Sequence, residues 1–190
     1  APRESEVLFV YPLDLSAVEE RFGSWMAQYG YANYISAAKL LQLGRVENGR
    51  LRVKGSAYRA VCLLFEPFPA AELLDLLEGF ARAGGTLVWS GIPPQVNGAE
   101  DFVARVFGAR LTQAGPQGLA LPGRRVCFAG GLAGVQAMSI LTDFTVDRLY
   151  PLEPLAGAEA LASVRPGGSG AALTVGARRV YAGGGQAVLL

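Results

Sequence analysis

Polar side chains stand where three apolar runs of the sequence end. Tyr11 closes the run VLFVY, with Asp14 shortly after it, Glu66 follows AVCLLF, and Ser90–Gly91 follow TLVW. Ligands of open parallel sheets bind beyond the carboxyl ends of the strands, so these groups are predicted to line one ligand-binding crevice. Alternatively, Glu66 and Ser90 only cap neighbouring helices or bond to loop backbone, as polar groups at strand ends usually do.

Ser90 raises the question of nucleophilic catalysis. A nucleophile elbow has the form G-x-S-x-G and leads directly into a helix, whereas Ser90 stands in VWSGIPP. The chain has no histidine at all, which removes the commonest general base, every His-dependent triad and every His metal site. We therefore predict no catalytic residue, no metal ligand and no cofactor in this chain.

Two further patterns have simpler structural explanations. Ala129-x-Gly131-x-x-Gly134 is part of a dinucleotide fingerprint, but the segment after it is too short for the crossover helix that such a site requires, so we interpret it as a glycine-rich turn. Asp143 and Asp147 would lie roughly 13 Å apart in an extended segment, too far for joint acid–base work. They are interpreted as surface charges.

Three tyrosines, Tyr29, Tyr31 and Tyr34, gather where two predicted helices meet. Their rings could stack on a sugar. Tyr29 fits the apolar face of the first helix, however, so packing is the preferred interpretation.

The composition excludes several classes of protein. The chain has 190 residues, of which 51% are hydrophobic and 17% charged, with a net charge of +1. It can bury a sizeable core, and it is neither disordered nor basic enough to predict nucleic acid or an anionic membrane as a partner. No apolar run reaches the roughly 18 residues of a membrane helix. Cys62 and Cys127 lie in strand-like runs and are predicted to be buried.

The first 110 residues alternate strand and helix patterns. Apolar runs at 6–12, 57–67 and 86–94 predict buried strands, and periodic segments at 15–30, 34–44, 69–85 and 97–111 predict helices. This order predicts an α/β fold, three-layered, with a mostly parallel sheet and helices on both faces. The last 80 residues predict extra β-strands and hairpins. We expect one domain over residues 1–190, as a piece of a longer polypeptide.

The layout resembles a known family. Gly49, Leu51, Val53, Gly55 and Tyr58 match a G-x-L-x-V-x-G-x-x-Y approach to a buried strand, and FARAGGTLV matches F-x-x-A-G-G-x-L-V. With the closing GARRVYAGGGQAVLL, these motifs are similar to the glutamine-amidotransferase-like α/β domain of glycoside hydrolases, of which the β-galactosidase trimerisation-type domain is one form. About 170 of the 190 residues take part in the resemblance.

The resemblance implies a flavodoxin-like fold, but not amidotransferase activity. Class I amidotransferases carry a Cys nucleophile after the third buried strand, where this chain has VWSGIPP, and a His that this chain lacks. It implies an accessory role beside a neighbouring catalytic domain or subunit, with carbohydrate and a second copy as further possible partners. The alternative is a stand-alone protein or enzyme that binds a sugar or small molecule in the crevice.

Overall fold

The computed structural model describes residues 5–11, 33–63, 66–112, 118–139, 148–167 and 170–190. The chain divides into two compact units, the first comprising Ala1–Ser90 and Val180–Ala187 and the second Gly91–Arg179 and Val188–Leu190. The predicted helix at 15–30, Asp14, Asp143 and Asp147 lie outside the described residues.

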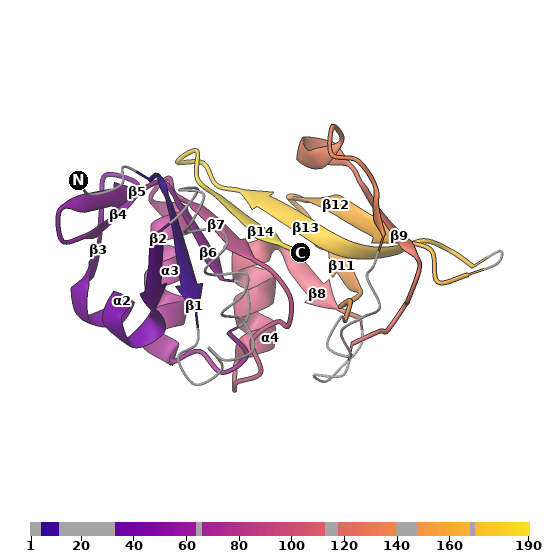
Figure 1. The fold of residues 1–190 in the computed structure, drawn as a ribbon, viewed down its shortest axis with the longest axis horizontal. Helices are drawn as coiled ribbons and strands as arrows, with labels where there is room; N and C mark the ends of the chain where they lie inside the picture. Colours follow the sequence, from indigo (N-terminus) through magenta and orange to yellow (C-terminus); the bar gives the residue numbers. More distant parts are fainter. Residues whose placement is uncertain (1–4, 12–32, 64–65, 113–117, 140–147, 168–169) are drawn as a thin grey trace. The chain divides into compact units, whose positions relative to one another are not determined.

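Parallel strands form the centre of the first unit (Figure 1). They are β1 (Val7–Tyr11), β2 (Asn33–Ser36), β6 (Ala60–Leu63) and β7 (Thr86–Trp89), hydrogen-bonded in the order β7-β6-β1-β2. Three of these strands confirm the predicted buried runs. β2 is a correction, because the segment that begins at Tyr34 was predicted to be entirely helical.

Strand alternation divides the side chains of these strands into two rows. The first row is at most 1% exposed and consists of Leu8, Val10, Val61, Leu63, Leu87 and Trp89. The opposite row is less buried, with Phe9 at 7% and Cys62 and Val88 half-buried. The predicted core is therefore confirmed for the first row, while Val7 and Val88 are less buried than expected and Leu64 lies outside the described residues.

Two helices of the first unit contact each other. α2 (Ala37–Leu43) begins at Ser36, whose hydroxyl accepts a hydrogen bond from the Lys39 amide, and α3 (Ala71–Arg82) follows β6. Leu73, Leu77 and Phe80 of α3 have no exposed surface. The described residues thus give this unit a helical layer on one face of its strands, and the predicted layering on both faces is not shown.

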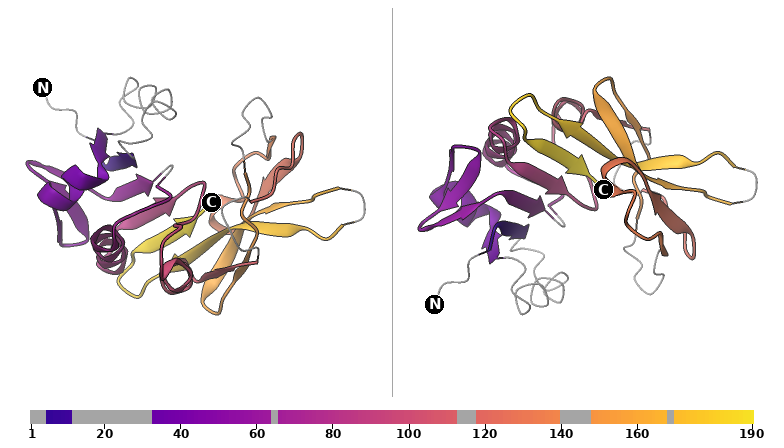
Figure 2. Two further views of the ribbon diagram at one scale, coloured as in Figure 1. Left: turned by 90° about the horizontal axis from the view of Figure 1, so that it is seen from below. Right: turned by 90° about the horizontal axis from the view of Figure 1, so that it is seen from above.

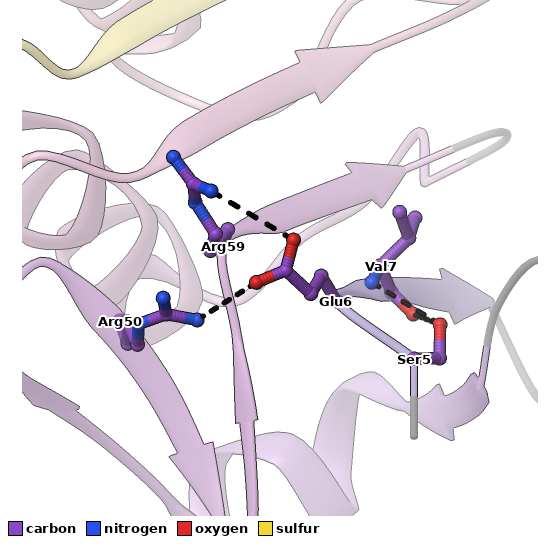
Figure 3. Close-up of polar contacts among 5 residues, drawn as sticks. All are labelled: Ser5, Glu6, Val7, Arg50 and Arg59. Carbon is purple, nitrogen blue, oxygen red and sulfur yellow. Dashed lines mark hydrogen bonds and ion pairs between the residues drawn. The ribbon is translucent and has the colours of Figure 1, made fainter. Parts of the chain in front are cut away.

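A three-stranded antiparallel meander joins α2 to β6. It consists of β3 (Gly44–Glu47), β4 (Arg50–Val53) and β5 (Ser56–Tyr58), of which only β4 was predicted. The predicted turn lies at Asn48 and Gly49, both at positive φ. The Glu6 carboxylate, just before β1, binds Arg50 at 3.2 Å and Arg59 at 3.8 Å and so fastens the meander to the first strand (Figure 3).

The second unit is mostly antiparallel. α4 (Ala99–Phe102) continues into a π-helical turn, η2 (Val103–Phe107), and β8 (Ala109–Leu111) pairs with β11 (Leu152–Pro154). A second set of strands runs in the order β10 (Met138–Ser139), β9 (Arg125–Phe128), β12 (Ala158–Val164) and β13 (Leu173–Val180). Both views of Figure 2 show β12 and β13 as a long pair. β14 (Gln186–Leu189) follows β13 through a turn closed by the Tyr181 amide on the Gly185 carbonyl.

The expectation of extra strands and hairpins in the last 80 residues is therefore confirmed. The fold as a whole is α/β, but its strands are mixed rather than mostly parallel, because the antiparallel part is as extensive as the parallel part. In the part of the chain that the structure describes, no helix is both long and apolar enough to cross a bilayer.

Candidate functional site

The structure brings Tyr11 and Ser90 to the same edge of the first unit. Val10, Leu63 and Trp89 are in register across β1, β6 and β7, and Tyr11 and Ser90 each come one residue later. Two strand spacings place their backbones about 10 Å apart. By alternation both side chains belong to the less buried row.

Glu66 lies beyond the same edge, in the loop between β6 and α3. Its side chain is buried, with 7% of the residue exposed, and the Oε2 atom is shielded from solvent. Pro67 and Pro69 beside it are buried, whereas Phe68 between them is 71% exposed. The predicted carboxylate is therefore held inside the loop, and an aromatic ring stands outside it.

Gly91, the fourth predicted residue that the structure describes, belongs to the second unit. It has a φ of 88° and its amide donates to the Leu190 carbonyl at 2.9 Å. Its visible role is to hold the C-terminal residue through backbone hydrogen bonding. Similarly, the Ser90 amide donates to the Leu63 carbonyl at 2.8 Å.

Tyr34 is a neighbour of this edge that the sequence did not assign to it. Its ring stacks on Phe9 with centroids 5.4 Å apart and lies 6.4 Å from the Tyr11 ring. Burial, and secondarily the nearby Cys62, raise the pKa of the Tyr34 phenol above its ordinary value. Tyr34 therefore stays a neutral hydroxyl, suited to hydrogen bonding and stacking rather than to proton transfer.

The two cysteines have different environments. Cys62 is half-buried on β6, and burial raises the pKa of its thiol to about 11, so it is a poor nucleophile at neutral pH. Cys127 is exposed, which corrects the prediction that it is buried. The reason is the alternation of β9, where Val126 and Phe128 pack on the apolar cluster of the second unit and Cys127 faces away from it.

The segment with Gly131 is a turn, as interpreted. It forms a short 3₁₀-helix, Gly130–Leu132, and leads into β10 rather than a crossover helix. The Gly131 amide donates to the Glu159 carboxylate at 3.3 Å, and Glu159 pairs with Arg178 at 2.7 Å. An internal carboxylate therefore takes the amide that a phosphate would need. Among the described residues, no group of three or more His, Cys, Asp or Glu side chains could hold a metal ion.

No family model and no curated protein matches this sequence, but solved structures with a similar fold exist. The chain is similar to a β-galactosidase from Bacillus circulans sp. alkalophilus, with a TM-score of 0.64 and 18% identity over 99% of this chain and 28% of that one. It is also similar to a catalytic mutant of a GH42 β-galactosidase from G. stearothermophilus, with a TM-score of 0.64 and 17% identity over 100% of this chain and 28% of that one.

A third similar structure has a length closer to that of this chain. It is a ThuA-like protein from Bacteroides uniformis, with a TM-score of 0.62 and 13% identity over 100% of this chain and 82% of that one. The chain thus spans only about 28% of the length of the two β-galactosidases. At these identities the likeness shows the fold alone, and it is the fold that the glutamine-amidotransferase-like resemblance implies.

Proposed function

We propose that this chain is a non-catalytic accessory domain of a multidomain glycoside hydrolase, which contributes to domain packing, to oligomerisation or to the rim of a neighbouring active site. One observation carries the proposal. Nearly the whole chain matches a segment that makes up only 28% of two β-galactosidases, so that in those proteins a large remainder accompanies this fold.

The chemistry of the chain supports a role without catalysis. There is no histidine in the sequence, and the Cys62 thiol stays protonated at neutral pH because its pKa is about 11. A glycosidase normally uses two carboxylic acids about 5–10 Å apart. The carboxylate predicted for the crevice, Glu66, is buried in a loop, which does not suit a group that must reach a glycosidic bond.

We also propose the finer, flavodoxin-like layering for the first unit. Crossovers between parallel strands are right-handed. The chain moves from β6 to β7 in one direction along the order β7-β6-β1-β2, with α3 as the connection, and from β1 to β2 in the opposite direction. Right-handedness then assigns the β1–β2 connection to the face opposite α3, where the less buried row of Phe9, Cys62 and Val88 lies.

The test of the accessory function is the full polypeptide. Determining its mass and sequence shows whether a glycoside hydrolase domain accompanies residues 1–190, as we expect. Activity on aryl glycosides is then expected in the full polypeptide and not in the 190-residue chain. A native polypeptide that consists of this chain alone would refute the proposal.

A stand-alone ligand-binding protein is the second candidate. It is favoured by the two phenols and the hydroxyl that meet at one edge, Tyr11, Tyr34 and Ser90, and by the ThuA-like structure, 82% of which this chain covers. Titration of the chain with monosaccharides, followed by tyrosine resonances in NMR spectra, tests it. Saturable shifts that Tyr34→Ala abolishes and Phe68→Ala retains would support it, and their absence at millimolar sugar would reject it.

A further inference from the structure

The connection between β9 and β10 is an exposed surface without charge. No charged residue occurs between Arg125 and Asp143, and in residues 129–137 most positions are exposed, including Val135 at 45%. This connection, drawn in salmon and orange, projects from the edge of the strands of its unit (Figure 1). We call residues 129–137 the arm.

The arm has a defined conformation. Its amides at Leu132, Ala133 and Val135 donate to carbonyls three residues earlier, at 2.9–3.1 Å. The Gly131 amide also donates to Glu159, which Arg178 holds at 2.7 Å. A segment held in this way loses little conformational entropy when a partner covers it, which favours binding.

Glycines at the base of the arm let it pack closely on this ion pair. A Cβ at Gly130, whose φ is 55°, would lie 2.8 Å from the Glu159 Oε1 atom, and one at Gly131 would lie 2.6 Å from an Arg178 nitrogen. At the tip, in contrast, a Cβ on Gly134 would meet nothing within 4 Å. The base is thus fixed to β12 and β13, and the tip faces open space.

The chemistry of the arm selects the kind of partner. Nucleic acids and anionic lipids are bound through Lys and Arg, and the arm has neither. Small apolar side chains and Val135 fit instead an uncharged, apolar protein surface, since covering them removes apolar area from water.

The size of the arm selects the connection to that partner. Nine small residues fall well short of the roughly 800 Å² per partner that a stable complex of free proteins buries. A contact of this size persists when the partner is tethered, because the effective concentration is then in the millimolar range. A second copy that meets the arm with its own arm gains no such tether.

We propose that the arm docks on an uncharged, apolar surface of another domain of the same polypeptide. This inference rests on the proposed accessory function, which supplies that domain. Phe68 and Val180 are the other large exposed hydrophobic residues in the described part of the chain, and neither stands in a comparable uncharged stretch.

Two engineered thiols test the arm. In a Cys127→Ser background, Gly134→Cys places a thiol at the tip, and Gly55→Cys places a control thiol on the β4–β5 turn, where a Cβ is equally unobstructed. The alkylation rate by iodoacetamide is measured in the 190-residue chain and in the full polypeptide. We expect at least tenfold slower alkylation at position 134 in the full polypeptide and equal rates at position 55.

The outcomes separate the two proposals. If a second domain is present and position 134 reacts equally fast in both forms, the arm proposal fails and the accessory function stands. If no second domain exists, both fail. Protection within the 190-residue chain that grows with its concentration would identify a second copy as the partner and overturn the inference. Hydrogen exchange of residues 129–137 in the unsubstituted proteins must show the same protection, which guards against an effect of the substitution itself.

Discussion

At the residue scale, Leu63 offers the sharpest measure of the core. Its side chain has no exposed surface and stands between Val10 and Trp89 in the parallel strands. Leu63→Ala should lower the free energy of unfolding by about 2–5 kcal/mol, because it removes buried methyl groups and leaves a cavity. Urea unfolding followed by tryptophan fluorescence measures the change.

Phe68→Ala is the matched control, since Phe68 is 71% exposed. A surface truncation of this kind should change the free energy of unfolding by no more than about 0.5 kcal/mol. A loss below ~1 kcal/mol for Leu63→Ala would mean that the central strand is misplaced.

The two native thiols should react at very different rates. Cys127 is exposed, whereas burial raises the pKa of Cys62 from 9.0 to about 11. Only the thiolate is nucleophilic, so iodoacetamide at pH 8 should label Cys127 alone in the folded chain. Mass spectrometry of the labelled peptides decides this, and equal labelling of both thiols would contradict the environment assigned to Cys62.

The same shift has a consequence for stability at high pH. Below pH 9 the Cys62 thiol is neutral in both the folded and the unfolded chain, so its contribution is fully present. Above pH 9 the unfolded thiol ionises while the folded one does not, until about pH 11. The contribution of this group to the free energy of unfolding therefore falls over that range. Cys62→Ala should remove this part of the pH dependence.

At the scale of the elements, two glycines near α3 should respond oppositely to alanine. Gly79 lies exposed within α3, and a Cβ there meets nothing within 4 Å. Gly79→Ala should stabilise the chain by about 0.5–1 kcal/mol, because alanine is the better helix former. At Gly185, before β14, a Cβ would overlap the Ala81 carbonyl oxygen, so Gly185→Ala should destabilise it. Thermal unfolding of both variants checks the pair, and stabilisation by Gly185→Ala would refute this packing.

The elements also show which signals the sequence contains. The strands at 7–11, 60–63 and 86–89 and the helix at 71–82 were predictable because their apolar patterns are long or periodic. β2 was missed because four residues are too few for a period. Its signal was local, since Tyr34 and Ile35 favour strands and Ser36 is a typical N-cap.

The candidate site was predictable only in part, for the same reason. Tyr11 and Ser90 could be placed at one edge because both end recognisable parallel strands. Tyr34 joins them only through β2, so its place was lost with that strand. The pairing of Gly131 with Glu159 depends on a contact between segments 28 residues apart, which no local pattern encodes.

At the scale of the whole molecule, the 190-residue chain should hydrolyse neither glutamine nor aryl glycosides. It has no histidine, and neither Ser90 nor Cys62 has an evident activating base. Assays for ammonia release from glutamine and for nitrophenol release from nitrophenyl glycosides measure both reactions. Glutaminase turnover that Ser90→Ala abolishes would contradict the prediction directly.

The last prediction concerns self-association of the whole chain. Its net charge is only +1 and 17% of its residues are charged, so little electrostatic repulsion separates two copies. Phe68, Val135 and Val180 expose 71%, 55% or less of their surface in the described residues, and such side chains associate when they meet. Their separation in the sequence and the small area of the arm make the association weak.

Sedimentation over a hundredfold range of concentration is the measurement that decides this. We expect a monomer at low concentration and a rising weight-average mass at the highest concentrations, because a small apolar contact between untethered copies has a low affinity. Val135→Glu should suppress this rise if the arm takes part in it, since a buried unpaired carboxylate is costly. A single monomeric species throughout would remove self-association as support for the accessory role and leave docking within one polypeptide as the arm's function.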